Sequence, residues 1–540
     1  MTEHIDTAPF IEFNRSIEEL ELPGSIYDQL TITAGKYGQK LAWNFIDSDI
    51  QRNWFEVLAL VDNAANAFSS IGIKAGTHVG VMSWNREEFL ITWLALSKLQ
   101  AVMVPINASY TSRELDYALQ LSDAEYLFIE NDFAVLFEEA EASKTFKNVI
   151  YFDPNDKDTL TWKSIHDNVS GQIPEIERNR NALLNLQFTS GTTGFSKACE
   201  LTNDYWLTLG ASSTAFFGSD IKRFYVGSSI YYMVGQRIFL NALFSGGTIF
   251  VPRKPSAKRF MSDVSKYECE YCAAFEIVFK QPPSEADRDH KLKLVSIFGF
   301  SKDNHKQFEE RFGVRGQEFY GMTEIGGATY MPRELLVQMS GSGSCGISAP
   351  WREVAVFDTE TNKQVTANSI GELRVRGRSI LRGYYKNPEA TEDSFIDGWF
   401  TTGDLARIDE QGFVYILGRN KDMVRRMGEN IACREVESVI RQIPEIEEVA
   451  LIPVPDEFRG EEGKVYIKLH EGKSPEIVTP QLILDFCKGK LADFKIPRYL
   501  EYRTEFPLTD SQRVQKKKLI AEKPDLTVGA FDRQTGTWNS

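Results

Sequence analysis

The chain has 540 residues, of which 42% are hydrophobic and 25% are charged, as is typical of a soluble globular protein. A chain of this length is too long for one hydrophobic core, so we expect two or more domains. The formal net charge of −15 disfavours a general nucleic-acid binder, which needs a basic surface.

Cysteine usage and apolar runs limit where the protein can work. Six cysteines in so long a chain do not make a disulfide framework. Cys269 and Cys272 have C-x-x-C spacing, but no second pair or nearby histidine completes a zinc site, so we expect core cysteines. The first residues are acidic where a signal peptide would be basic. The longest apolar run, 91–105, contains Lys98 and Gln100 and is too short to span a bilayer. We therefore expect a cytoplasmic protein without a membrane span.

Residues 54–129 alternate between helical and extended patterns, after an N-terminal stretch of short apolar runs and acidic turns without a recognisable motif. Alternation at this spacing favours an α/β fold in which helices cover sheets. The apolar spacing predicts helices at 54–71, 87–99 and 113–121, and strands at 79–82, 101–106 and 126–129.

A dense polar loop follows the apolar run 183–188. Glycines let backbone N–H groups turn towards an anion, hydroxyls add donors, and lysine adds a positive charge. A Walker A loop is excluded, because it would need glycine at Ser196. The density of donors beside one lysine predicts a polyphosphate-binding loop rather than a polar surface turn. Its residues are Thr189, Ser190, Gly191, Thr192, Thr193, Gly194 and Lys197.

The pattern Thr-Ser-Gly-Thr-Thr-Gly-x-x-Lys at 189–197 resembles the phosphate loop of the adenylate-forming (AMP-binding) superfamily, which includes acyl-CoA synthetases, peptide-synthetase adenylation domains and firefly-type luciferases. Ala198 stands where this family usually has glycine. The resemblance runs from about residue 30 to about residue 520 and rests on four motifs in the family's order. Residues 190–206 and 425–431 look most like the carnitine/crotonobetaine–CoA ligase branch.

Residues 229–235 occupy the place of the family pattern Pro-x-Phe/Tyr-His-x-x-Gly. Tyr231 matches the aromatic position, whereas Tyr232 replaces the histidine and Ser229 replaces the proline. The resemblance implies that Tyr231 and Tyr232 line the acyl pocket. Composition alone favours two ordinary half-buried aromatic residues.

The second strong motif is Phe319-Tyr-Gly-Met-Thr-Glu. Alone, a Thr-Glu pair is more often a helix N-terminus. Magnesium prefers few carboxylates together with phosphate oxygens, which suits one glutamate. The resemblance implies that Tyr320 stacks on adenine beside Gly321 and Met322, that Thr323 contacts the α-phosphate, and that Glu324 ligates Mg²⁺.

Two later motifs supply ribose ligands by the same resemblance. Gly398-Trp-Phe-Thr-Thr-Gly-Asp ends on Asp404, whose carboxylate can accept both ribose hydroxyls, although an aspartate after glycine is also common in turns. Tyr415-Ile-Leu-Gly-Arg ends on Arg419, which matches the family arginine that also reaches the ribose. The large α/β N-terminal domain is expected to end at residue 418, just before Arg419.

The resemblance implies a fold with a large multi-sheet α/β N-terminal domain at 1–418 and a small mobile α+β C-terminal lid at 419–520. Lys421 stands at the hinge, and Gly428 and Glu429 resemble the turn that lines the pantetheine channel of CoA. Residues 521–540 are expected to form a loosely ordered tail. Within the lid, spacing predicts helices at 434–442 and 480–491 and strands at 449–453 and 464–469.

The final motif departs from the family where the catalytic lysine is expected. The family form ends in Gly-Lys-Ile/Val-x-Lys, and this chain has Gln512-Arg513 in place of Gly-Lys. Arginine keeps the positive charge but is planar and bulkier than lysine. We therefore expect Arg513, with Thr323 and Lys197, to be the catalytic groups.

The implied reaction has two steps, with ATP, Mg²⁺ and coenzyme A as cofactors and a small carboxylic acid as substrate. The carboxylate attacks the α-phosphate of ATP and releases pyrophosphate, and the CoA thiol then displaces AMP from the acyl-adenylate. Two alternatives stay open: an adenylation-only or carrier-loading enzyme, and a nucleotide-binding pseudoenzyme, because Arg513 and Tyr232 depart from the pattern. The acyl group and a homodimeric assembly also stay open.

Overall fold

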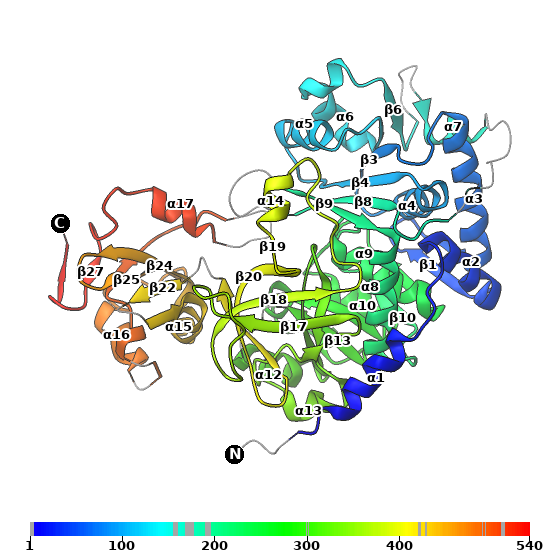
Figure 1. Ribbon diagram of the computed structural model, residues 1–540. Helices are drawn as coiled ribbons and strands as arrows, with labels where there is room; N and C mark the ends of the chain where they lie inside the picture. Colours follow the sequence, from blue (N-terminus) through cyan, green and yellow to red (C-terminus); the bar gives the residue numbers. More distant parts are fainter. Residues whose placement is uncertain are drawn as a thin grey trace. The chain divides into compact units, whose positions relative to one another are not determined.

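The computed structural model describes residues 5–154, 160–167, 176, 178–189, 196–298, 300, 302–419, 423–426, 429–488, 490–491, 493–508 and 514–539, without the side chains at 275–277, 303, 419, 423, 425, 429–430 and 432. The chain divides into two compact units (Figure 1). The first comprises Met1–Val354, Val375–Phe400 and Gln411–Val414, and the second comprises Ala355–Arg374, Thr401–Glu410 and Tyr415–Ser540.

A nine-stranded sheet forms part of the first unit. Its central strands are parallel, and antiparallel strands close both edges. The order is β16 (Ile347–Ser348), β15 (Gly326–Tyr330), β14 (Gly316–Met322), β13 (Leu294–Phe298), β12 (Tyr271–Phe275), β10 (Arg223–Tyr225), β11 (Thr248–Val251), β1 (Leu41–Phe45) and β2 (Ile50–Asn53).

A seven-stranded sheet carries the strand that leads into the predicted phosphate loop. All its neighbours are parallel except β8 and β9, which form an antiparallel hairpin. The order is β7 (Leu160–Thr161), β6 (Asn148–Tyr151), β5 (Tyr126–Ile129), β3 (His78–Met82), β4 (Val102–Ile106), β8 (Leu183–Phe188) and β9 (Ala198–Thr202).

Helices pack against both sheets of the first unit. α8 (Asn203–Phe217) packs along α9 (Met233–Ser245) (Figure 1). It also contacts β9 of one sheet and β15 of the other. The remaining helices are α1 (Ala8–Glu18), α2 (Ile26–Tyr37), α3 (Trp54–Ser70), α4 (Glu87–Leu99), α5 (Ser112–Leu121), α6 (Ala134–Glu139), α7 (Trp162–Asp167), α10 (Phe260–Lys266), α11 (Glu276–Phe279), α12 (Lys302–Phe312), α13 (Leu336–Met339) and α14 (Pro388–Glu392).

Local chemistry explains where these helices begin. The side chain of Asn53 accepts from the backbone N–H of Glu56, whose carboxylate accepts from the backbone of Asn53, so a capping box starts α3. At α8 the side chain of Thr202 accepts from the N–H of Tyr205, which caps the helix N-terminus. α8 and α9 are buried along most of their length, which explains why their sequences lack a polar face.

A five-stranded sheet has the order β17 (Arg352–Phe357), β18 (Gly371–Gly377), β20 (Trp399–Ile408) and β19 (Phe395–Ile396), with β21 (Val414–Arg419) beside β20. In the second unit, α15 (Cys433–Ile440), α16 (Pro480–Cys487) and α17 (Lys516–Ala521) accompany another sheet. Its order is β23 (Glu429–Ala432), β22 (Met423–Arg426), β25 (Gly460–Leu469), β26 (Tyr499–Tyr502), β27 (Phe531–Asp532) and β28 (Thr537–Trp538), with β24 (Ile446–Asp456) beside β25.

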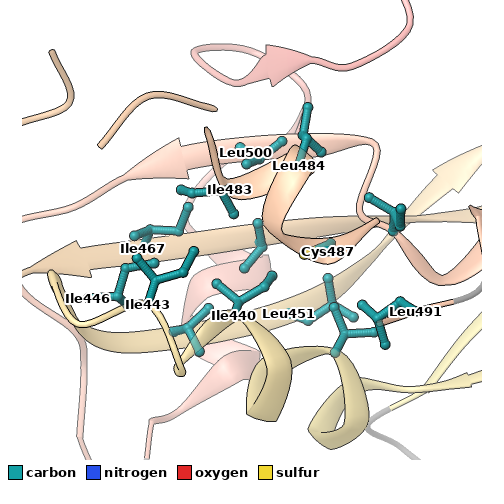
Figure 2. Packing of buried hydrophobic residues seen from close by; sticks show 14 of the residues in the cluster. Ile440, Ile443, Ile446, Leu451, Ile467, Ile483, Leu484, Cys487, Leu491 and Leu500 are labelled. Atoms are coloured by element: carbon teal, nitrogen blue, oxygen red, sulfur yellow. The ribbon is translucent and has the colours of Figure 1, made fainter. Parts of the chain in front are cut away.

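An aliphatic core holds α15 and α16 against one face of this last sheet. Figure 2 shows Ile440 of α15, Ile483 and Leu484 of α16, and Ile467 and Leu500 of the sheet gathered in one cluster. Each of these side chains is at most 3% exposed, so the two helices and the sheet share one core. The expected α/β fold with a smaller α+β part is confirmed.

The expectation of a loosely ordered tail at 521–540 is wrong for the described residues. β27 pairs with β26, and Asp532 accepts hydrogen bonds from Arg498. Asp532 is buried, as are Leu519 of α17 and Ala530. The segment has no run of apolar residues that would predict a strand. One ion pair and a few small side chains fix it instead.

Two further expectations can be compared with the structure. α16 ends at Cys487 rather than at 491, because Lys488 has extended backbone (ψ 136°). All six cysteines are free thiols and all are buried, as expected for core residues. Across the part of the chain that the structure describes, no helix is both long enough and apolar enough to cross a bilayer.

Candidate functional site

The predicted phosphate loop connects β8 to β9. The backbone N–H of Thr189 donates to the carbonyl of Lys197 (3.0 Å), which closes the hairpin beneath the loop. The hydroxyl of Tyr117 donates to the carbonyl of Ser196 (3.1 Å). The loop residues Ser190, Gly191, Thr192, Thr193 and Gly194 lie outside the described residues.

A second segment, residues 381–385, pairs with β9 directly after the loop. The N–H of Tyr385 donates to the carbonyl of Ala198 (2.8 Å), and the N–H of Glu200 donates to the carbonyl of Gly383 (2.9 Å). This pairing places the ring of Tyr384 against Lys197, whose Nζ lies 4.4 Å from the ring centroid. The lysine predicted to bind phosphate is thus held at the base of the loop by a cation–π contact.

The second motif forms the tight turn between β14 and β15. Gly321 pairs with Gly327, and a Cβ added at Gly321 would lie 2.4 Å from the carbonyl oxygen of Gly326, so only glycine fits there. The N–H of Tyr320 donates to Oγ1 of Thr329 (3.2 Å), and its hydroxyl contacts Sδ of Met322 (3.4 Å). The turn therefore presents Thr323 and Glu324 together at one end of the hairpin.

Glu324 and Tyr384 join the two motifs. The hydroxyl of Tyr384 donates to Oε1 of Glu324 (3.0 Å), and the N–H of Leu381 donates to the Glu324 carbonyl (2.7 Å). Burial, reinforced by the negative charge of Glu324, raises the pKa of Tyr384, so its phenol stays a donor. Lys197, Tyr384 and Glu324 therefore form one cluster, which we call the lysine–tyrosine–glutamate cluster.

The turn is also tied to the segment predicted to border the acyl pocket. The hydroxyl of Tyr205 in α8 donates to the carbonyl of Thr323 (2.9 Å) and lies 3.3 Å from Sδ of Met233, the first residue of α9. Burial raises the pKa of Tyr205, which keeps the hydroxyl protonated. The start of α9 thus lies next to the residue expected to contact the α-phosphate.

Tyr231 and Tyr232 immediately precede α9. Tyr231 is buried, and its carbonyl accepts from Nε2 of Gln187 in β8 (2.7 Å). Tyr232 is 42% exposed, and its hydroxyl accepts from Nδ2 of Asn107 (3.0 Å). The two residues differ more in burial than composition suggests, since only Tyr232 presents its ring to solvent.

The predicted ribose ligand Asp404 lies in strand β20 of the second unit rather than in a turn. It is 6% exposed, and its N–H donates to Oγ1 of Thr402 (3.0 Å). That hydroxyl in turn donates to the carbonyl of Leu373 (2.6 Å). These bonds tie the backbone around Asp404 to the neighbouring strand β18.

The other predicted site residues fall at the limits of the description. Arg419 ends β21 and Glu429 begins β23, but their side chains are not described. Lys421, Gly428 and Arg513 lie outside the described residues. Within the described ranges, no group of three or more His, Cys, Asp or Glu side chains could hold a metal ion.

Sequence reasoning missed three residues of this region. The sequence assigns no role in the site to Tyr384 or Tyr205. Arg237, in α9, was not predicted as a site residue, although a charged residue within an apolar run is unusual. That charge within the run Met233–Ser245 was the one available indication.

Comparisons with known proteins agree with this geometry. The family model described as AMP-binding enzyme matches residues 30–385, and the model described as AMP-binding enzyme C-terminal domain matches residues 435–513. Crotonobetaine/carnitine–CoA ligase of Shigella flexneri is 30% identical over 513 residues, covering 90% of this chain and 97% of the relative.

Solved structures show the same architecture. The ATP-bound crystal structure of MatB from Rhodopseudomonas palustris has a TM-score of 0.80 and 26% identity, covering 91% of this chain and 98% of the other. The anthranilate–CoA ligase AuaEII, in complex with anthranoyl-AMP, has a TM-score of 0.82 at 22% identity, covering 94% and 98%, which supports the fold. Since the family model spans most of the chain and the relative covers nearly all of it, the chain belongs to the AMP-binding enzyme family of ATP-dependent, adenylate-forming acyl-CoA ligases.

Proposed function

We propose that this site joins a small carboxylic acid to CoA through an acyl-adenylate. The observation that carries the proposal is the lysine–tyrosine–glutamate cluster. It brings the base of a phosphate loop and the carboxylate of the Tyr320–Glu324 turn to the same tyrosine ring. Such a cluster offers a cation and a carboxylate around one polyphosphate, which is what nucleotide activation of an acid needs.

Glu324 fits a magnesium ligand. Its carboxylate is 8% exposed and accepts from the neutral phenol of Tyr384, which orients the carboxylate without cancelling its charge. We propose that Glu324 holds Mg²⁺ together with phosphate oxygens. The ion would neutralise part of the phosphate charge when bound.

The remaining roles are those that the motifs imply through the family resemblance. Thr189 to Gly194 and Lys197 would bind the outer phosphates, Thr323 the α-phosphate, Tyr320 the adenine, and Asp404 with Arg419 the ribose. The acid carboxylate attacks the α-phosphorus, the bond to the bridging oxygen breaks, and pyrophosphate leaves with that electron pair. We propose that Arg513 stabilises negative charge on the α-phosphate during this step.

The second step needs a different arrangement of the C-terminal residues. We propose a lid that begins near residue 419, turns at Lys421 and brings Gly428 and Glu429 to the pantetheine arm of CoA. The CoA thiolate then attacks the acyl carbonyl, and AMP leaves. We also propose that the reaction occurs in the cytoplasm, since six buried free thiols suit a reducing compartment.

The metal role of Glu324 is tested by Glu324→Gln. Removing one charge without removing core volume should lower magnesium- and ATP-dependent pyrophosphate release by about 100-fold or more. A matched control is Glu353→Gln, because that side chain is 62% exposed and forms an ion pair with Arg376 at the surface. Pyrophosphate release close to wild type in Glu324→Gln, at equal thermal stability, would remove the metal assignment.

Arg513 is tested by comparing two substitutions. Arg513→Ala should slow adenylation by about 100-fold, because it removes a cation at developing charge, whereas Arg513→Lys should match or exceed wild type. Thioester formation from supplied acyl-adenylate should stay near wild type in both. If Arg513→Ala releases pyrophosphate as fast as wild type, the cation has no catalytic role. If the wild type itself forms no adenylate with any acid, the chain is a nucleotide-binding protein without ligase activity.

A further inference from the structure

A buried arginine lines a narrow cavity beside the adenylation turn. The cavity lies between α8, α9 and the β14–β15 hairpin, and in this conformation it has room for about one water molecule. Its wall includes Ser212 and Phe217 of α8, Arg237 of α9, Gln317 and Phe319 of β14, and Gly327 of β15.

The surroundings of Arg237 do not balance its charge. The side chain is 5% exposed, and its Nη2 donates to the hydroxyl of Tyr271 (3.1 Å). The guanidinium lies 4.6 Å from the ring centroid of Phe319 and 5.2 Å from that of Phe217. Among the side chains that the structure describes, no carboxylate forms an ion pair with it.

Tyr271 does not supply the missing negative charge. Its hydroxyl donates to Oγ of Ser296 (2.7 Å), so it acts as a neutral link between Arg237 and the serine. Burial raises the pKa of Tyr271, which keeps the phenol protonated. Arginine itself stays charged at any physiological pH. The cavity wall therefore carries a positive charge, and most N–H groups of Arg237 have no acceptor among the side chains that the structure describes.

A buried charge without a counter-charge is costly, and proteins usually pair or hydrogen-bond it. A hydrophobic residue of similar size would fill the position at lower cost. Two aromatic faces and one phenol lower the cost of burying Arg237 without neutralising it. The arrangement is that of a binding site for an anion rather than of a structural ion pair.

Residues of the cavity wall are close neighbours of the residues proposed to carry out adenylation. Phe319 precedes Tyr320 in β14, and Gly327 faces Gly321 across the hairpin. Arg237 lies one helical turn after Met233, which contacts the tyrosine that hydrogen-bonds the carbonyl of Thr323. A Cβ added at Gly327 would meet no atom within 4 Å, so space is open at this point of the wall.

We propose that Arg237 binds a second carboxylate, at the end of the acid substrate that is remote from the activated carboxylate. This rests on the proposed function, since it assumes that the acid is activated at the Thr323–Glu324 turn. Arginine binds a carboxylate through two parallel N–H donors. A carboxylate needs more room than one water, so the rings of Phe217 and Phe319 move aside when it binds. The enzyme therefore selects dicarboxylic acids.

The test measures pyrophosphate release by the full-length enzyme with acids in matched sets. Each set has one chain length and contains the dicarboxylic acid, its monomethyl ester and the methyl-ended monocarboxylic acid. We expect kcat/KM for the best dicarboxylic acid to exceed that of its two partners by about 100-fold, because a buried cation left without its partner costs affinity. Equal or better turnover of the monocarboxylic acid would overturn the proposal and leave the ligase function standing.

Substitution then locates the preference. Arg237→Met should lower kcat/KM for the dicarboxylic acid to the level of the monomethyl ester, and Arg237→Lys should keep part of the preference. The matched control is Arg223→Met, which also removes an arginine that lies over a phenylalanine ring, Phe250 at 4.6 Å, but does not line the cavity. A dicarboxylate preference that survives in Arg237→Met would overturn the assignment to Arg237.

Two other outcomes are also informative. If Arg237→Met does not fold, the wild-type comparison of acid and monomethyl ester decides the proposal by itself. If the wild type releases pyrophosphate with no acid in any set, the proposed function fails, and the proposal fails with it.

Discussion

Two buried arginines in this chain have opposite surroundings. Arg374 in β18 lies in the second unit, donates from Nε to Oε2 of Glu372 (3.1 Å) and from Nη2 to Oδ1 of Asn362 (2.6 Å), and lies 4.7 Å from the ring of Phe357. Arg237 in α9 has aromatic neighbours of the same kind but a phenol in place of the carboxylate. Both are at most 5% exposed.

The difference distinguishes an arginine that stabilises the fold from one that is available to bind a ligand. Arg374 completes an ion pair within its own sheet, so its binding partner is part of the chain. Arg237 uses only part of its hydrogen-bonding capacity within the described residues, so its remaining N–H groups can donate to a ligand. Burial alone does not distinguish the two roles, whereas the identity of the nearest acceptor does.

The largest expected effect is on the stability of the paired arginine. Arg374→Met should lower the free energy of unfolding of the second unit by about 3–5 kcal/mol, because Glu372 would remain as a buried charge without its partner. Urea unfolding followed by far-UV circular dichroism measures this change. A loss below about 1 kcal/mol would show that Glu372 is solvated or finds another donor, and would weaken the comparison.

The buried ion-paired site at His305 leads to a prediction about how stability depends on pH. His305 is 4% exposed, and its two ring nitrogens lie 2.9 Å from Glu318 and 3.2 Å from Glu309. Burial opposes its charge, but the two carboxylates prevail and raise the pKa of His305 from 6.5 to about 9. Stabilisation is therefore complete below pH 6.5 and is lost as the pH rises through 9, on the order of 3 kcal/mol in total.

His305→Gln should remove most of this slope in the free energy of unfolding between pH 6.5 and 9. His166→Gln is the control, because burial lowers the pKa of His166 and its ring lies against a backbone carbonyl rather than a carboxylate. An unchanged slope in His305→Gln would mean that other groups release the protons. The measurement thus tests whether buried charges outside the cavity are paired.

The smallest expected effect belongs to the arginine of the cavity. Arg237→Met leaves no buried carboxylate behind, so the free energy of unfolding should change by less than about 1 kcal/mol or should increase. Thermal unfolding of the ligand-free variant beside wild type measures this. A loss as large as that of Arg374→Met would place Arg237 with the structural arginines and remove the basis of the comparison.

Regular elements were predictable from the sequence where periodicity was strong. The helix predicted at 87–99 is α4, and the strand predicted at 126–129 is β5. The family motifs also drew attention to residues 316–330, which form the β14–β15 hairpin, whereas the binding roles of the motif residues stay predictions. Apolar spacing and loop chemistry are local properties, which explains why these predictions needed no knowledge of the folded chain.

The contacts that join the motifs could not be predicted in this way. Tyr384 meets Glu324 across 60 positions of sequence, and Tyr205 meets Thr323 across 118. Neither contact leaves a periodic pattern, because it depends on how β9 pairs with residues 381–385 and how α8 packs on β15. The ordered segment 521–539 was missed for a similar reason, since Asp532 is fixed by Arg498, 34 positions away.

The burial of all six cysteines has a practical consequence for spectroscopy. Buried thiols react slowly, because burial raises the thiol pKa, as it does for Cys199 and Cys272. The tip of the β24–β25 hairpin carries Phe458, which is 89% exposed. A Phe458→Cys variant would therefore accept a maleimide dye ahead of every native thiol. Fluorescence from that position could then follow the second unit through a catalytic cycle. The native cysteines would not have to be removed first.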